Sequence, residues 1–298
     1  MHYPLSTIHY PLSTIHYPLS TIHYSRSPDV NISIILVNYN GAEFLAECLN
    51  SLAKFINADC EVIIVDNSSA DNSVEIVRTR FPWVQLICSE VNLGFGKANN
   101  LAVEQSQGKY LLFLNTDTLL TEHTPQILAD YLDREPDVAA IGTRITFQDG
   151  SYQLSSGMLP NLAIEFIDKI RYGLDRQWHN RVANIYNKQY STIREVGWVT
   201  GACLTIRRDI YQKLGGFDPK FFMYFEDKDL CKRIRDLGFK VIYYPDTSII
   251  HLLGGSSKNV TKNVDHYYRD SQRYYYQKHL NGIQLKILKL YLRLSGKI

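Results

Sequence analysis

The sequence is short of several features that would each point to a particular class of protein. Among its 298 residues are only five cysteines (Cys48, Cys60, Cys88, Cys203 and Cys231), and no two of them form a C-x-x-C pair. This argues against a disulfide framework or a structural zinc site and is typical of reduced thiols. Lysine and arginine number 32 against 30 for aspartate and glutamate, so the net charge of +2 does not indicate nucleic-acid binding.

Long apolar segments are also absent. No run reaches the roughly 18 to 20 residues that a membrane-spanning helix needs. The N-terminus lacks the charged-then-apolar order of a signal peptide. With 45% apolar residues, the chain can nevertheless bury a full core. We therefore expect a soluble, globular, cytoplasmic protein.

A heptapeptide repeat begins the chain. Residues 2–22 are three copies of His-Tyr-Pro-Leu-Ser-Thr-Ile, and a fourth His-Tyr follows at His23 and Tyr24. A seven-residue period can indicate a coiled coil, but each copy contains a helix-breaking proline and lacks the flanking charges of a zipper. The DNA unit CACTATC, repeated and read through three successive frames, encodes the same residue order. We therefore interpret residues 1–28 as a translated DNA repeat that is disordered and binds no metal.

Beyond the repeat, apolar strand-like runs alternate with segments of helical spacing. The runs are Ile32–Val37, Glu61–Val65, Val84–Cys88 and Tyr110–Leu114, and the first helical segment is Ala42–Phe55. The order βαβαβαβ predicts a buried parallel sheet with right-handed crossovers. Ligands of such sheets bind outside the carboxyl ends of the strands.

Polar and glycine-rich motifs gather at these carboxyl ends. Singly, each has a local explanation, because Asn-Gly makes a turn and Asp-Asn-Ser-Ser caps a helix. At four consecutive strand ends, together, they indicate one binding site. A dinucleotide fingerprint is not indicated, because Gly94-x-Gly96 follows the third strand and lacks the third glycine. The candidate residues, in strand order, are Asn38, Tyr39 and Asn40; Asp66; Asn92, Gly94, Phe95 and Asn99; and Asn115, Thr116 and Asp117.

Six motifs follow one another between Asn31 and Gly255. They are Val37-Asn38-Tyr39-Asn40-Gly41, Val65-Asp66-Asn67-Ser68-Ser69, Asn92-x-Gly94-Phe95, Asn115-x-Asp117, Trp198-x-x-Gly201-Ala202 and Phe221-Phe222-Met223-Tyr224-Phe225-Glu226-Asp227-x-Asp229-Leu230. In this order they resemble the family 2 glycosyltransferases, most closely the rhamnosyltransferase-like branch. The resemblance implies an α/β fold of GT-A type, in which a mostly parallel, Rossmann-like sheet is flanked by helices. It also implies a C-terminal acceptor-binding part. Beyond Lys262 the sequence itself turns helical and aromatic, which predicts a helical tail.

The implied division of the chain places the nucleotide sugar on residues 29–135, acceptor binding and catalysis on residues 136–262, and the tail on residues 263–298. The implied reaction is an inverting transfer of a sugar from a nucleoside diphosphate donor, dTDP-rhamnose or a UDP-sugar. The acceptor is a hydroxyl group of a glycan or of a lipid-linked molecule. A catalytically inactive nucleotide-sugar-binding module is the alternative that stays open.

The resemblance also implies roles for residues of the donor site. Asp66 and the loop after the first strand would hold the base and ribose, and Gly201 would also contact the donor. Asp117 would bind Mn²⁺ or Mg²⁺, which prefer carboxylate and phosphate oxygens, and His251 would complete the metal shell. The usual D-x-D motif is Asn115-Thr116-Asp117 here, so one charge is missing.

The segment that begins near Glu226 is expected to carry the catalytic base. Leu230, Ile234 and Leu237 have the spacing of an inward helical stripe, and one turn earlier this stripe reaches Glu226 and Asp227. The helix dipole also stabilises acidic residues at a helix N-terminus, which is a local explanation for Glu226 and Asp227 that needs no catalytic role. The resemblance implies that Asp227 takes the proton of the acceptor hydroxyl, with Glu226 as the second candidate.

Three further residues are expected near the acceptor or the diphosphate. Trp198 is either a platform for a sugar or an ordinary core residue. Asp229 lies four residues before Arg233, so an acceptor contact and an ion pair both stay open. Lys258 follows a glycine-rich stretch and is expected to reach the diphosphate.

The C-terminal tail is basic and amphipathic. Lys286, Lys289 and Arg293 share one helical face. This arrangement suits peripheral contact with an anionic membrane surface, here the inner face of the plasma membrane. Packing of the helix on the domain is the open alternative.

Overall fold

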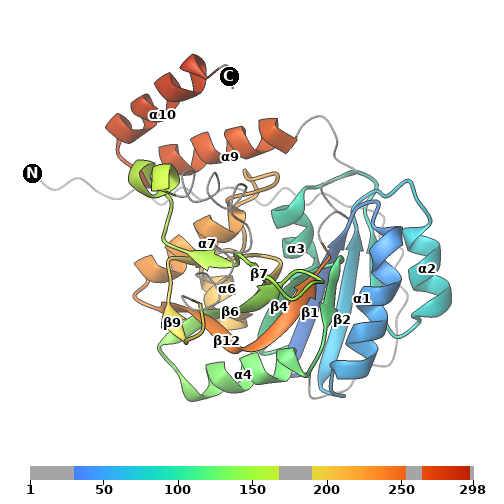
Figure 1. The fold of residues 1–298 in the computed structure, drawn as a ribbon. Coiled ribbons are helices and arrows are strands. Elements are labelled where there is room, and N and C mark those ends of the chain that lie inside the picture. The colour runs from blue at the N-terminus through green and yellow to red at the C-terminus, as the bar shows by residue number, and fades with distance from the viewer. Residues whose placement is uncertain (1–29, 168–189, 253–263, 296–298) are drawn as a thin grey trace, which may run out of the picture.

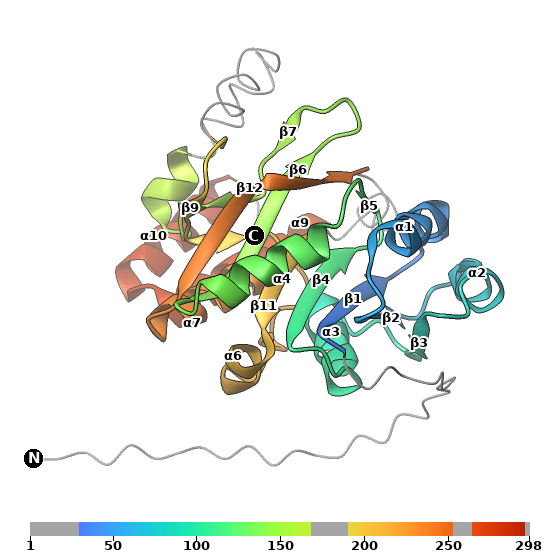
Figure 2. The same ribbon diagram turned by 90° about the horizontal axis from the view of Figure 1, so that it is seen from below.

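The structure is a computed structural model that describes residues 30–167, 190–252 and 264–295. The heptapeptide repeat and Lys258 lie outside the described residues. A single mixed sheet runs through the molecule between two groups of helices (Figures 1 and 2). Its strand order is β3-β2-β1-β4-β11-β6-β12-β5.

The first half of this sheet is parallel and confirms the predicted βαβαβαβ order. The predicted Ala42–Phe55 helix has the observed bounds. The strands are β1 (Ile32–Asn38), β2 (Cys60–Asp66), β3 (Gln85–Cys88) and β4 (Tyr110–Asn115), and the helices are α1 (Ala42–Phe55), α2 (Ser73–Arg80) and α3 (Phe95–Glu104).

The second half of the sheet is mixed. β11 runs antiparallel to both β4 and β6, while β12 runs parallel to β6 and antiparallel to β5. Two short strands lie off this order, with β7 paired to β6 and β9 paired to β12, and β8 and β10 form a separate ribbon. The strands are β5 (Thr118–Leu120), β6 (Val138–Thr146), β7 (Tyr152–Gln153), β8 (Ser156–Gly157), β9 (Arg194–Glu195), β10 (Trp198–Val199), β11 (Cys203–Arg207) and β12 (Lys240–His251); the helices are α4 (Thr124–Arg134), α6 (Arg208–Lys213) and α7 (Glu226–Asp236).

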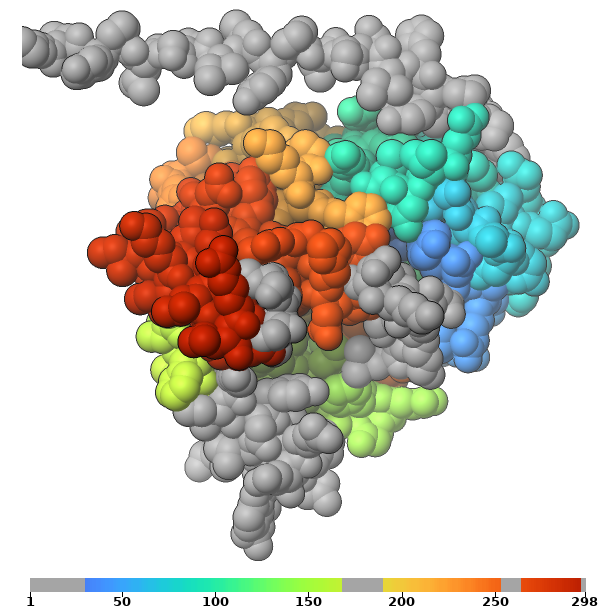
Figure 3. All heavy atoms as spheres, turned by 90° about the horizontal axis from the view of Figure 1, so that it is seen from above, coloured from blue at the N-terminus to red at the C-terminus, as the bar shows by residue number. Residues whose placement is uncertain are grey.

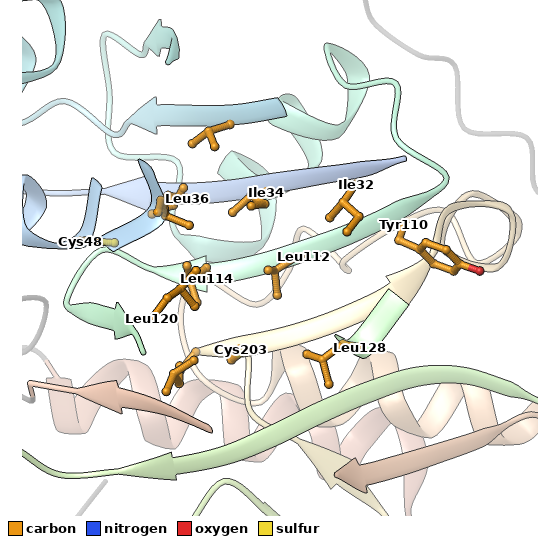
Figure 4. Close-up of a cluster of buried hydrophobic side chains, with 14 of the residues drawn as sticks. Ile32, Ile34, Leu36, Cys48, Tyr110, Leu112, Leu114, Leu120, Leu128 and Cys203 are labelled. Atoms are coloured by element: carbon orange, nitrogen blue, oxygen red, sulfur yellow. The ribbon is translucent and has the colours of Figure 1, made fainter. Parts of the chain in front are cut away.

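Alternating side chains of the strands build one core on each face of the sheet. Ile32, Ile34 and Leu36 of β1 pack toward α1, α2 and α4, and Figure 4 shows them beside Leu112 of β4. Ile35 points to the opposite core, which α3, α6 and α7 cover. Because both faces are covered, the strands are near-continuous apolar runs, as in other buried parallel sheets.

One prediction about α7 is wrong. Helical spacing predicts Leu237 on the inward stripe, but its side chain is 39% exposed. The helix ends at Asp236, and Gly238, with a φ of 87°, turns the chain away. Leu230 and Ile234 are fully buried as expected.

The C-terminal tail forms two helices, α9 (Val264–His279) and α10 (Gly282–Leu294). They lie together on one face of the molecule (Figure 3). Leu288 and Leu292 of α10 join a third buried cluster with Tyr275 and Tyr276 of α9. One face of α10 therefore packs on the domain. Within the described residues, no helix has both the length and the apolar character to cross a bilayer.

Candidate active site

The carboxyl ends of the four parallel strands meet at one edge of the sheet. Asn38 of β1 is in register with Asp66 of β2, which is in register with Cys88 of β3. On the other side of β1, Val37 is in register with Asn115 of β4. Polar residues from separate parts of the sequence thus become neighbours.

Two buried oxygens mark the centre of this edge. Asn38 donates from Nδ2 to Ser69 Oγ at 3.1 Å, and the Ser69 amide donates to Asp66 Oδ2 at 3.1 Å. Asn38 Oδ1 and Asp66 Oδ1 are buried and have no hydrogen-bond partner among the described residues. Burial raises the pKa of Asp66. A Cβ at Gly41 would lie 2.4 Å from Asn38 Oδ1, so a side chain there would displace the Asn38 amide.

The loop after β1 is held to the loop after β2. Asn40 has a φ of 52°, and its Oδ1 accepts a hydrogen bond of 2.7 Å from the Ala70 amide. Its own amide donates to Ser69 Oγ at 2.9 Å. Tyr39 is half-buried, and Thr116 is buried near Gly41. The Asn40 side-chain oxygen thus helps to hold the loop after β1 against the loop after β2.

The loop after β3 is ordered by amide side chains. Asn92 Oδ1 accepts hydrogen bonds of 2.9 Å from both the Gly94 amide and Asn67 Nδ2. Asn99 is buried and donates from Nδ2 to the carbonyl oxygen of Phe95 at 2.9 Å. The Phe95 amide donates to the carbonyl oxygen of Phe222 at 2.9 Å, which ties α3 to the segment before α7. Asn67 lies in one of the six motifs, but the sequence did not single it out as a site residue.

The two expected metal ligands lie in contact. His251 Nε2, at the end of β12, is 3.0 Å from Asp117 Oδ1, and both side chains are buried. The Leu252 amide also donates to the Asp117 carbonyl oxygen at 2.8 Å. Asn115 Nδ2 lies 3.4 Å from the same imidazole nitrogen. Over the described part of the chain, no group of three or more His, Cys, Asp and Glu side chains is arranged to hold a metal ion.

Gln153 of β7 also contacts His251, and the sequence did not indicate it. Its Oε1 lies 3.1 Å from His251 Nδ1. With this oxygen accepting from Nδ1–H, the other imidazole nitrogen is left to face Asp117. Gln153 belongs to no recognisable motif, and only the pairing of β7 with β6 brings it here.

Helix α7 begins with two carboxyl groups in different surroundings. Asp227 is half-buried and accepts hydrogen bonds from the Gly201 amide at 3.1 Å and from the Lys228 amide at 2.7 Å. Glu226 is 6% exposed, and its Oε2 has no hydrogen-bond partner among the described residues. Burial, followed by the charge of Asp227, raises the pKa of Glu226 to about 8. Burial also raises the pKa of Asp227.

The backbone before α7 is strained. Tyr224 and Phe225 have φ values of 70° and 65°, a conformation that costs non-glycine residues on the order of 1–3 kcal/mol each. This turn lets the first residues of α7 face Gly201. A Cβ at Gly201 would lie 3.1 Å from the Phe95 ring, so the close approach also involves the loop after β3.

The two expected acceptor residues differ in their environment. Trp198 is half-buried, and Lys228 Nζ lies 4.8 Å from its ring centroid. Asp229 is fully buried and contacts Arg233 Nε at 2.8 Å, Lys278 Nζ at 2.7 Å and His279 Nε2 at 2.6 Å. Burial acts to raise the pKa of Asp229, but the hydrogen bond from His279 and the charge of Arg233 lower it overall. The Asp229–Arg233 ion pair that the sequence left open is present within α7, and the contacts with Lys278 and His279 join α7 to α9.

Named relatives include two rhamnosyltransferases. N-acetylglucosaminyl-diphospho-decaprenol L-rhamnosyltransferase of Mycobacterium tuberculosis is 29% identical over 238 residues, which cover 74% of this chain and 75% of the relative. Rhamnosyltransferase WbbL of Escherichia coli K12 is 26% identical over 232 residues, which cover 74% of this chain and 83% of the relative. The resemblance to this branch is thereby confirmed.

Solved structures confirm the GT-A fold. Staphylococcus aureus TarS 1–349 in complex with UDP-GlcNAc matches with a TM-score of 0.60 at 18% identity, covering 87% of this chain and 70% of that one. The mannosyltransferase PcManGT of Pyrobaculum calidifontis, in complex with GDP-Man and Mn²⁺, matches with a TM-score of 0.52 at 16% identity, covering 92% and 84%. The family model described as glycosyl transferase family 2 matches residues 33–215. The chain therefore belongs to glycosyl transferase family 2 and is a glycosyltransferase.

Proposed function

We propose that the protein transfers a rhamnosyl group from a nucleoside diphosphate donor to a hydroxyl group of a lipid-linked or glycan acceptor, with inversion. One pair of contacts carries the proposal. The Asn115 amide donates to the Ala202 carbonyl oxygen at 3.1 Å, and the preceding Gly201 amide donates to Asp227. Gly201 and Ala202 are neighbours in the sequence. They therefore link the end of β4, which leads to Asp117, to the Asp227 carboxylate of α7. The rhamnosyl group is favoured by the names of the relatives from M. tuberculosis and E. coli.

The nucleotide is proposed to bind at Asn38 and Asp66. Both present a buried oxygen without a hydrogen-bond partner in the described part of the chain. Buried acceptors of this kind are rare in proteins unless a ligand or water supplies the donor. The imide N–H of a pyrimidine base and the hydroxyl groups of a ribose are donors of the required type. A UDP or dTDP donor fits this requirement.

A divalent ion is proposed to bind at Asp117 and His251. A carboxylate oxygen and an imidazole nitrogen at 3.0 Å form a donor set that suits Mn²⁺ better than Mg²⁺, because Mg²⁺ prefers oxygen ligands. Gln153 orients the imidazole as outer ligands do in metal sites. Two protein ligands leave positions for phosphate oxygens and water. When bound, such an ion would neutralise charge on the leaving diphosphate.

The remaining chemistry is assigned to α7. Asp227 accepts the proton of the acceptor hydroxyl while the hydroxyl oxygen bonds to the anomeric carbon. The bond from this carbon to the diphosphate oxygen breaks, and its electron pair leaves with the nucleoside diphosphate. With a pKa of about 8, Glu226 is mostly protonated at neutral pH, so the negative charge of the pair lies on Asp227. The raised pKa of Asp227 brings this base closer to neutral pH.

The test combines a donor panel with one substitution. Purified protein is given UDP- and dTDP-sugars with Mn²⁺ and a lipid-linked acceptor, and we expect nucleoside diphosphate release to be fastest with a rhamnosyl donor. Asp227→Asn should lower kcat about 100-fold or more, because a positioned base contributes roughly that much. Its donor Kd should change less than about twofold, since a base acts in the transition state.

Asp236→Asn is the matched control, because Asp236 lies at the exposed end of the same helix. Near-wild-type turnover of Asp227→Asn at saturating substrates would exclude Asp227 as the base. Donor binding by the wild type without turnover on any acceptor would instead favour the inactive nucleotide-sugar-binding module.

A further inference from the structure

Helix α10 has two apolar faces, and only one of them is covered. Leu288 and Leu292 are buried against α9. A second set, here called the exposed stripe, comprises Ile283, Ile287, Leu290 and Leu294, which are 69%, 49%, 59% and 81% exposed. Their spacing of i, i+4, i+7 and i+11 places all four on one side of the helix. A continuous apolar surface of this kind usually marks an interaction site.

A basic edge lies directly beside the exposed stripe. Lys286, Lys289 and Arg293 each precede a stripe residue by one position, and all three are exposed. No acidic residue occurs between Gly282 and Leu294. The solvent side of α10 therefore offers apolar side chains along its length and a single sign of charge along one edge.

A neighbouring segment adds apolar surface. The helical turn at residues 162–167 lies beside α10 in Figures 1 and 2, and the Leu162 amide donates to Gln284 Oε1 at 3.3 Å. Phe166 and Ile167 of this turn are 65% and 42% exposed. The turn and α10 thus both expose large apolar side chains to solvent beside their contact.

We propose that the exposed stripe docks α10 on the surface of an anionic phospholipid bilayer. In this arrangement α10 lies in the plane of the membrane interface, with the stripe among the acyl chains and the basic edge among the headgroups. Charge complementarity selects this occupant over a second copy of the chain, because pairing of two copies would bring like-charged edges together. Each basic residue near an anionic surface strengthens binding by about fivefold.

The docked helix is mechanically joined to the catalytic helix. α10 packs on α9, and Lys278 and His279 of α9 contact the buried Asp229 of α7, two residues after Asp227. Docking would therefore hold α7 at a set position relative to the bilayer. This consequence rests on the proposed function, since it matters only if the acceptor is lipid-linked. Docking itself does not depend on catalysis.

The test measures sedimentation of the full-length protein with lipid vesicles. The probes are vesicles of phosphatidylcholine alone and of phosphatidylcholine mixed with phosphatidylglycerol, without sugar donor or acceptor. We expect the wild type to sediment with the mixed vesicles and much less with phosphatidylcholine. The Ile287→Glu/Leu290→Glu variant should lose binding at least about tenfold. The Lys286→Glu/Lys289→Glu variant should lose the preference for anionic lipid.

Two control variants show that the effect is local. Trp83→Glu places an acid on an exposed apolar residue just before β3, an edge strand of the sheet, and Lys213→Glu reverses a charge on α6. Both should bind vesicles like the wild type. Circular dichroism melts and nucleoside diphosphate release with a water-soluble acceptor check that all variants are folded.

Two results would overturn the proposal. The first is a wild type that stays in the supernatant with anionic vesicles. The second is equal vesicle binding by the stripe variant and the wild type. A wild-type dimer that the stripe variant converts to monomer, without vesicle binding, would assign the surface to a second copy of the chain. Vesicle binding by a protein without transferase activity would leave docking intact and reject the proposed function.

Discussion

At the residue scale, the two carboxyl groups at the start of α7 make the stability of the protein depend on pH. The pKa of Glu226 rises from an ordinary value of 4.5 to about 8, mainly because the group is buried. The folded state therefore binds more protons than the unfolded state between these values. The stabilisation is complete below pH of about 4.5 and is lost as the pH rises through about 8.

We predict that Glu226→Gln reduces this loss of stability. Each unit by which a pKa is raised corresponds to about 1.4 kcal/mol, so the variant should retain at least about that much more of its free energy of unfolding at high pH. Urea unfolding across a pH series provides the measurement. Glu43→Gln on the exposed face of α1 serves as the control. Parallel pH profiles for Glu226→Gln and the wild type would contradict the assignment.

The proposed metal site gives a prediction with a binding readout. Asp117→Asn should abolish the Mn²⁺-dependent part of UDP or dTDP binding, measured by calorimetry, and His251→Ala should weaken it less. Gln153→Ala should weaken it by about 10- to 100-fold, because residues that orient a ligand imidazole have effects of that size. His266→Ala, on an exposed part of α9, is the control. Nucleotide binding that ignores both Mn²⁺ and chelator would exclude the site.

At the element scale, Gly94 connects α3 to the segment that leads into α7. Its φ is 77°, and a Cβ there would lie 2.3 Å from the Phe222 carbonyl oxygen. That oxygen accepts the hydrogen bond from the Phe95 amide. The two halves of the site are thus held in contact by a residue that cannot carry a side chain.

We predict that Gly94→Ala is much more damaging than Gly238→Ala. Gly238 also has a positive φ, of 87°, but no atom lies within 4 Å of a Cβ built there. Gly238→Ala should therefore cost only the left-handed backbone, about 1–2 kcal/mol. Gly94→Ala should cost at least about 2 kcal/mol more, because it also forces two backbone segments apart. Thermal unfolding tests this, and equal losses for both variants would show that the contact with Phe222 is unimportant.

At the scale of the whole molecule, the heptapeptide repeat is expected to be dispensable. Residues 2–24 contain three prolines and no Asp, Glu, Lys or Arg, and from this composition we expect them neither to pack as a helix nor to add surface charge. Deleting them should change the melting temperature by less than about 2 °C and leave transferase activity within about twofold. A loss of several degrees would show that the segment contributes to the fold.

Local patterns in the sequence by themselves determined much of this protein. Apolar runs and helical spacing predict the four parallel strands and α1. The places of the polar motifs at the strand ends predict a shared binding site. These signals are local, because hydrophobic periodicity and turn chemistry depend on neighbouring residues. The end of α7 shows the limit of such patterns, since Leu237 has the spacing of a buried residue but follows the last turn of the helix.

The family resemblance already implied that Asp117 and His251 share a metal ion, but only the tertiary structure showed how such distant residues meet and added Gln153. Asp117 and His251 are 134 positions apart, and Gln153 reaches His251 across 98 positions. Their contact depends on the strand order β4-β11-β6-β12-β5, which places the end of β12 beside β5, next to Asp117. The tertiary structure also decided which apolar face of α10 is covered. Strand order and helix docking are set by the packing free energy of the whole chain, which no short stretch of sequence contains.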